Sequence, residues 1–231
     1  MAGLTFTTDE YGALLDRLVA EFRFVGYDAP LSDGELALRH DVDLSVDRAL
    51  AMANVEAERG ISSTYCLLVA APVYDPTDPA TRRAIERIDA LGHDVALHFD
   101  PHRYWPAADE PPADEIVERV LDERRSLARL FGLSEPVVST HVPPEWLLDR
   151  AFDAFTSTYA PEFFSEVPYV SDSNQRWRDE RPFPDGVPDR AQMLVHPGLW
   201  TAEGRRLDDL LAAAADRGHE AVETYVGGLG Y

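Results

Sequence analysis

Strand-like and helix-like segments alternate along most of this sequence, and the alternation constrains the fold more than any other feature. Apolar, strand-like runs are expected at residues 36–41, 63–70, 94–98, 137–142, 169–171 and 192–195. Helical patterns are expected around them, at about 8–22, 45–59, 80–91, 113–131, 145–155 and 207–215. Such an order predicts parallel strands joined by right-handed crossovers. In 231 residues, six or seven such strands predict an α/β fold of the open or incomplete (β/α) barrel kind, as a single domain over residues 1–231.

Charge excludes some classes of partner. The chain carries a formal net charge of −21, and its 21 basic residues are all arginine. Such a surface repels a nucleic-acid backbone and an anionic membrane, so neither is an expected partner. An excess of acidic side chains together with the absence of lysine is typical of a cytoplasmic protein from an extreme halophile with GC-rich DNA. The alternative is an ordinary acidic protein from a GC-rich organism.

The compartment is expected to be the cytoplasm. The N-terminal segment shows no charged and apolar pattern typical of a secretory signal, and no apolar run is long enough to span a membrane. Cys66 is the single cysteine, so no intramolecular disulfide is possible. Because it lies in a strand-like apolar run, a buried structural thiol is expected.

Polar residues gather where the predicted strands end. These residues are Asp41, Asp43, His98, His102, His141, Asp172 and His196. The carboxyl ends of parallel strands meet at one edge of a sheet, which is where ligands and catalytic groups converge in such folds. We therefore expect a functional site at this edge.

His98 and His102 are a candidate pair of metal ligands. If the chain turns helically after the strand, a spacing of four aligns both imidazoles on one side. Two imidazoles and one carboxylate, from Asp43 or Asp41, make a catalytic metal site with a position open for water. The alternative is a pair of surface histidines near a proline turn.

Asp41 and Asp43 follow an apolar strand and precede a helix that Ser45 is expected to cap. One carboxylate can bind a metal while the other acts as a base, or either can simply cap the helix. His196 ends another apolar run, where it can donate a proton near neutral pH or serve as a hydrogen-bonded core histidine.

Together these motifs resemble the NodB-type polysaccharide deacetylases, the carbohydrate esterase family 4 group. The family's motif Gly-His-Glu-Ile-x-x-His-x-x-x-His is matched in register by residues 92–102, which read Gly-His-Asp-Val-Ala-Leu-His-Phe-Asp-Pro-His. Residues 39–43, Arg-His-Asp-Val-Asp, stand where the family has Thr-Phe-Asp-Asp, and residues 193–196 match its final apolar strand ending in histidine. Order and spacing agree over about residues 36–200.

The resemblance implies a distorted (β/α) barrel and a divalent metal. That metal is usually Zn²⁺, with Co²⁺, Ni²⁺ or Fe²⁺ as other possibilities, held by Asp43, His98 and His102. The resemblance also implies that Asp41 is the general base and that His196 is the general acid. Because Val42 separates the two carboxylates, their roles can be exchanged.

One family motif is incomplete. Residues 139–144, Ser-Thr-His-Val-Pro-Pro, stand where the family has Arg-Pro-Pro-Tyr, so the arginine that normally orients the base is missing there. We expect Arg176 to replace it, with Asp172 nearby and with His141 and Trp177 as further supporting or substrate-binding residues. The alternative for this last segment is a solvated loop.

These features predict a metal-dependent amide hydrolase that removes an N-acetyl or related acyl group from a sugar derivative. A second hypothesis keeps the site but assigns a small non-sugar amide such as a ureide. A third is a catalytically inactive module that binds metal or sugar during polysaccharide assembly. The sequence does not determine the acyl group, the metal or the oligomeric state.

Overall fold

A single parallel sheet organises the computed structural model, which describes residues 3–132 and 135–229. Within those residues the sheet has eight strands, in the order β6-β5-β4-β3-β2-β8-β7, with β1 paired to β2. The strands are β1 (Arg23–Val25), β2 (Glu35–Val42), β3 (Thr64–Leu67), β4 (Asp94–Phe99), β5 (Val137–Thr140), β6 (Thr156–Ser157), β7 (Tyr169–Ser171) and β8 (Ala191–Val195). The sheet is curled, with helices outside it, so the predicted incomplete barrel is confirmed.

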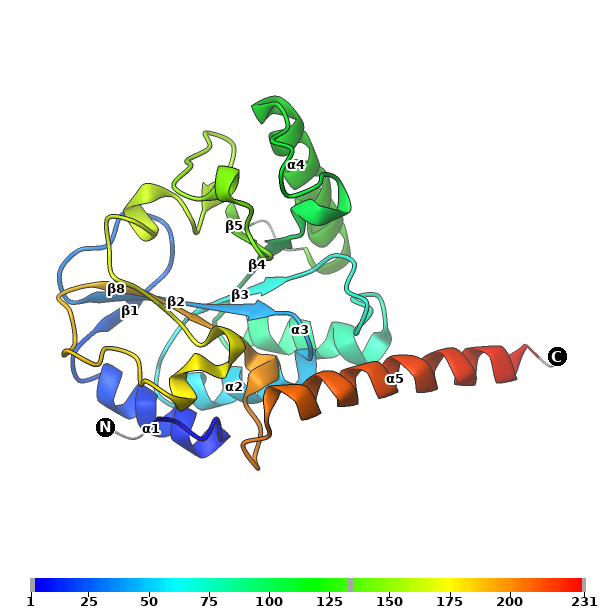
Figure 1. Ribbon diagram of the computed structural model, residues 1–231, viewed down its shortest axis with the longest axis horizontal. Coiled ribbons are helices and arrows are strands. Elements are labelled where there is room, and N and C mark those ends of the chain that lie inside the picture. The colour runs from blue at the N-terminus through cyan, green and yellow to red at the C-terminus, as the bar shows by residue number, and fades with distance from the viewer. Residues whose placement is uncertain (1–2, 133–134, 230–231) are drawn as a thin grey trace.

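Four helices, α1 (Thr8–Leu18), α2 (Val46–Ala57), α3 (Pro79–Ala90) and α4 (Ala113–Phe131), lie outside the sheet (Figure 1). The last helix, α5 (Leu207–Gly228), extends away from the body. Apolar side chains of α2 and α3 pack with those of β2 and β3, while α4 packs on β4 and β5. No described helix is both long and apolar enough to cross a membrane.

Local chemistry explains where several elements begin. Thr7 accepts a hydrogen bond from the backbone N–H of Glu10 and starts α1, and Ser45 caps α2 in the same way. Gly132, in the left-handed region at φ 74°, ends α4. The six predicted strands are all present, and Cys66 is buried in β3 as expected.

Three sequence-based expectations differ from the structure. The helix predicted for residues 145–155 is wrong: only a single 3₁₀ turn forms, Glu145–Leu147, and Asp149 at φ 54° breaks any continuation. Two short strands, β1 and β6, were not predicted, because three and two residues carry too little pattern. The last helix runs well past residue 215, to Gly228.

The two faces of β2 place its polar residues on opposite sides of the sheet. Side chains alternate along a strand, so Arg39 and Asp41 share one face while His40 shares the other with Val42. Asp41 pairs in register with Cys66 of β3, on the inner, concave side. The inner side is therefore where a site at the strand ends must form.

Candidate metal and acid–base site

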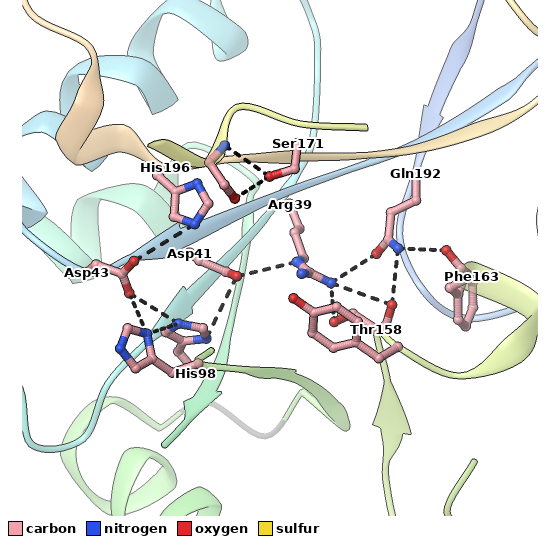
Figure 2. A network of polar contacts seen from close by, with 12 residues as sticks. Arg39, Asp41, Asp43, His98, Thr158, Phe163, Ser171, Gln192 and His196 are labelled. Atoms are coloured by element: carbon pink, nitrogen blue, oxygen red, sulfur yellow. Dashed lines mark hydrogen bonds and ion pairs between the residues drawn. The ribbon is translucent and has the colours of Figure 1, made fainter. Parts of the chain in front are cut away.

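Three side chains carried by β2, β4 and β5 converge at the predicted edge, with β3 between β2 and β4 in the sheet. Asp43 follows β2, His98 lies in β4, and His141 follows β5 directly. Asp43 Oδ1 lies 3.2 Å from His98 Nε2 and 3.1 Å from His141 Nδ1. The two imidazole nitrogens lie 3.2 Å apart, so the three atoms form a nearly equilateral triangle (Figure 2).

The triangle fits a metal ion. In a tetrahedral zinc site with bonds of about 2.0–2.1 Å, ligand atoms lie about 3.3 Å apart. These three residues are a group of described side chains able to hold a cation. Asp43 Oδ1 is buried and lies at ion-pair distance from both imidazoles, but it makes no well-aligned hydrogen bond to either. Buried polar atoms are rarely left unpaired, so the donor set suits a divalent metal with a position open to the cavity.

Electrostatics also favour charge on Asp43. Burial by itself raises the pKa of Asp43, but the adjacent His141 and His98 imidazoles lower that pKa well below its usual range. The Asp43 carboxylate raises the pKa of His141 in turn. An ionised carboxylate with two imidazoles directed at the same point is a chemically suitable ligand set for a cation.

His102 does not join this group in the structure. It lies in the 3₁₀ turn η1 (Pro101–Arg103), and its Nε2 contacts the carbonyl oxygen of Val142 at 2.9 Å. Val142 has a φ of 42°, a strained conformation for a β-branched residue, and it directly follows His141. His102 therefore holds the loop that carries His141, whereas the motif led us to expect His102 itself at the metal.

Asp41 lies beside the group and is paired with an arginine that sequence reasoning missed. Arg39 Nε is 3.4 Å from Asp41 Oδ1, and both side chains are buried. The guanidinium lies over the ring of Tyr159, 4.5 Å from its centre, and contacts Thr158 and Gln192. Arg39 thus occupies the place beside the carboxylate that we expected Arg176 to fill (Figure 2).

Arg176 and Trp177 lie away from the cavity. Arg176 is exposed, and its Nε donates to the backbone carbonyl of Ser173. Trp177 is buried in the core with α1, its ring 6.3 Å from that of Trp200. The segment turns through Asn174 and Gln175, both at positive φ, and this bend directs Trp177 inward.

His196 is held by Asp172 on the opposite side of Asp43. Its Nδ1 lies 2.6 Å from Asp172 Oδ1, and its backbone N–H also donates to that carboxylate. The other carboxylate oxygen accepts from the Trp200 indole at 2.8 Å. Burial alone lowers the pKa of His196, but the Asp172 carboxylate outweighs it and raises that pKa to about 9. Its Nε2 points toward Asp43, 3.9 Å from Oδ2.

A single cavity of about 460 Å³ joins these groups. Its polar lining includes Asp41, Asp43, His98, His141 and His196. Apolar side chains, among them Leu44, Leu199, Leu207 and Leu211, form another part of the wall. A concave, largely apolar site with a few convergent polar groups is the usual form of a small-molecule site.

Comparison with solved structures gives distant likenesses of fold. Peptidoglycan deacetylase PdaC from Bacillus subtilis is 14% identical with a TM-score of 0.45, covering 84% of this chain and 87% of its own. A family 4 acetyl xylan esterase from Clostridium thermocellum, solved in complex with a cobalt ion, is 17% identical with a TM-score of 0.41, covering 79% and 84%. A CE4 family pseudoenzyme from Bacillus anthracis is 14% identical with a TM-score of 0.45, covering 82% and 63%.

The second of these proteins is named a family 4 esterase, and the third is named a CE4 family protein. No family model matches the sequence. No curated protein matches it. Since none of these TM-scores reaches 0.5, the chemistry of the site rests on the residues of this chain alone.

Proposed function

We propose that this protein is a metal-dependent amide hydrolase that removes an acyl group from an N-acylated sugar derivative. One observation carries the proposal: Asp43, His98 and His141 form a ligand triangle in a cavity that Asp41 and His196 also line. A metal site, a base and an acid around one cavity are the groups that hydrolysis of an unactivated amide requires.

The ligand set we propose is Asp43, His98 and His141, with Zn²⁺ as the expected metal. A divalent ion bound there would polarise the acyl carbonyl and lower the pKa of water. His102 is not a ligand in this proposal. It contacts the carbonyl oxygen of Val142 and so holds the turn that follows His141. Groups that orient a ligand in this way raise metal affinity without touching the ion.

Asp41 is the proposed general base. It is not within the ligand triangle, yet it lines the same cavity and lies 3.8 Å from His98 Nδ1. Arg39 fixes the direction of its carboxylate. Thr158, Gln192 and the Tyr159 ring hold the guanidinium in turn.

His196 is the proposed general acid. Its Nδ1 is engaged by Asp172, which leaves Nε2 directed into the cavity toward Asp43. A histidine held protonated by a carboxylate can donate a proton to the departing amine. Asp41 and His196 thus divide proton acceptance and proton donation between two groups that line the same cavity.

The substrate class follows from the cavity and the motif resemblance. A cavity of about 460 Å³ with apolar and tyrosine surfaces accommodates a sugar ring and a short acyl chain. A cyclic amide such as a ureide is the second candidate, because the catalytic groups do not by themselves distinguish the two. The intact base and acid positions oppose a purely binding role.

The test is hydrolysis of matched panels by the zinc-loaded protein. N-acetylated hexosamines, free and nucleotide-linked, are compared with cyclic ureides, and the release of acetate or amine is measured. Acetate release that the His98→Ala variant abolishes supports the proposal. Turnover of the ureides alone would support the second candidate, and stoichiometric metal binding with no turnover of either panel would support a binding module.

Adaptation to high salt is proposed from the charge of −21 and the absence of lysine. At about 0.01 M salt the Debye length is about 30 Å, so carboxylate repulsion is poorly screened. We expect helical circular dichroism to fall on dialysis into dilute buffer and to recover in molar KCl. Identical thermal melts in both conditions would contradict it.

A further inference from the structure

The end of α5 projects beyond the rest of the molecule (Figure 1). Leu210 and Ala214 are buried against the body, but every residue from His219 to Leu229 is exposed. Among them are large apolar side chains: Val222 is 61% exposed and Tyr225 is 71% exposed. The projecting part, residues 219–229, is called the arm below.

Within the described residues, the arm is supported by an ion pair of its own, His219 Nε2 to Glu223 Oε1 at 3.2 Å, but its side chains are not buried against the body. Gly218, Gly227 and Gly228 lie in this helix, and each costs about 1 kcal/mol relative to alanine in a helix interior. A Cβ at any of the three would meet no atom within 4 Å, so the body of the protein does not require glycine there. A helical segment as short as the arm is marginal in water without packing. The arm therefore lacks tertiary packing within the described residues.

The exposed residues follow a coiled-coil pattern. Positions 211, 215, 218, 222, 225 and 229 are spaced alternately by four and three, and hold Leu, Ala, Gly, Val, Tyr and Leu. The charged residues between 212 and 229 are Asp216, Arg217, Glu220 and Glu223, and all fall on the opposite side of the helix. The six positions are called the seam below. They carry no charged side chain over five turns of helix, although the whole chain has a net charge of −21.

We propose that α5 pairs in antiparallel fashion with α5 of a second copy of this chain. In that register Leu211 packs against Leu229, Ala215 against Tyr225, and Gly218 against Val222, and the two-fold axis repeats each layer. Large side chains face small ones in the inner layers, which lets the helices approach closely. A parallel pair would place tyrosine against tyrosine and glycine against glycine.

A second copy fits better than another partner because the seam complements itself. Two chains that each carry −21 can meet there without burying charge, since the seam holds none. The pairing has a consequence for the candidate site: Leu211 lines its cavity, so Leu229 of the partner subunit comes to the cavity rim.

Matched variants at adjacent positions test the pairing. The full chain in molar KCl is expected to be a dimer by size-exclusion chromatography with light scattering. Val222→Asp, in the seam, is expected to be monomeric, while Thr224→Asp, outside it, remains a dimer. All four tryptophans precede α5, so fluorescence-monitored unfolding shows whether the body remains folded in each variant. A monomeric parent, or a dimeric Val222→Asp variant, would overturn the proposal.

A residue exchange tests the antiparallel register. Ala215→Tyr puts tyrosine against tyrosine and is expected to abolish the dimer. The double change Ala215→Tyr/Tyr225→Ala restores a large side chain opposite a small one and is expected to restore the dimer. A double variant that stays monomeric while the parent is dimeric would overturn the register.

Discussion

Strand β2 carries a buried polar cluster on each face, and the two clusters differ in whether they reach a cavity. On the outer face, the Glu56 carboxylate lies 2.7 Å from His40 Nε2 and accepts hydrogen bonds from Tyr11, Ser63 and Tyr65. On the inner face, His98 lies 3.8 Å from Asp41 Oδ1 and 3.2 Å from Asp43 Oδ1. The outer cluster is closed to solvent, whereas the inner one lines a cavity.

The difference separates a structural cluster from a functional one. Burial by itself raises the pKa of Glu56, but His40 and the hydroxyl groups of Ser63 and Tyr11 lower that pKa below its ordinary value, so the carboxylate is stabilised within the protein. The inner cluster lines a cavity in which a ligand can reach its carboxylates and imidazoles. Substitutions on the inner face should therefore remove chemistry, and substitutions on the outer face should remove stability.

The largest expected effect is on metal binding by the inner face. His98→Ala and His141→Ala each remove one of three ligands, so metal affinity should fall by at least about 1000-fold, beyond the 10–100-fold typical of an orienting residue. Competition titration with a chromogenic chelator measures this. Unfolding midpoints of the metal-free variants should stay close to that of the parent. Unchanged affinity in either variant would contradict the proposed ligand set.

Asp41→Asn separates the base from the ligands. Asparagine keeps the shape and one carbonyl oxygen but cannot accept a proton, so amide hydrolysis should fall by about 10²–10⁴-fold with metal affinity retained. Asp43→Asn replaces an anionic ligand by a neutral one and should weaken metal binding, with activity partly recovered in excess metal. Loss of metal in Asp41→Asn and retention in Asp43→Asn would mean that the two roles are reversed.

Glu56→Ala tests the outer face. It leaves His40 and three hydroxyl groups without their acceptor, and breaking a buried charged pair costs about 3–5 kcal/mol of unfolding free energy. Urea unfolding of the metal-free protein in molar KCl measures the loss. Glu58→Ala, an exposed position just beyond the same helix, serves as the control and should stay within about 0.5 kcal/mol. A Glu56→Ala variant as stable as the control would show that the outer cluster is not structural.

His102→Ala should have the smallest effect of the four. It removes the contact to the Val142 carbonyl but no proposed ligand, so metal affinity should fall by about 10–100-fold with one metal still bound per chain. The absorption spectrum of the Co²⁺-loaded protein should keep the parent's shape, because the ligands are unchanged. His219→Ala, an exposed position on α5, is the control. A spectrum changed as in His141→Ala would make His102 a ligand.

The edge at which the site forms could be predicted from the sequence, but the pairing within it could not. Asp41, Asp43, His98, His141 and His196 all lie at strand ends as expected, because parallel strands present one edge. The place of Arg39 beside Asp41 could be predicted, since residues two apart on a strand share a face. The family motif alone does not indicate Arg39, because it places the arginine in a later segment.

The position of His102 shows where local spacing fails. A spacing of four aligns side chains on an α-helix, but Pro101 begins a 3₁₀ turn, in which residues three apart align instead. His141 reaches His98 only because β4 and β5 pair with His98 beside Ser139, a register that no local pattern specifies. The pairing of β4 with β5 therefore determines that His141 is the third residue of the triangle.

The most direct test of the account is a crystal structure of the zinc-loaded protein with diffraction data on both sides of the zinc absorption edge. The account predicts one anomalous peak about 2.0–2.2 Å from Asp43 Oδ1, His98 Nε2 and His141 Nδ1, with Asp41 beside it and outside the ligand set. A peak bound by His98 and His102, or no peak at this edge of the sheet, would contradict it.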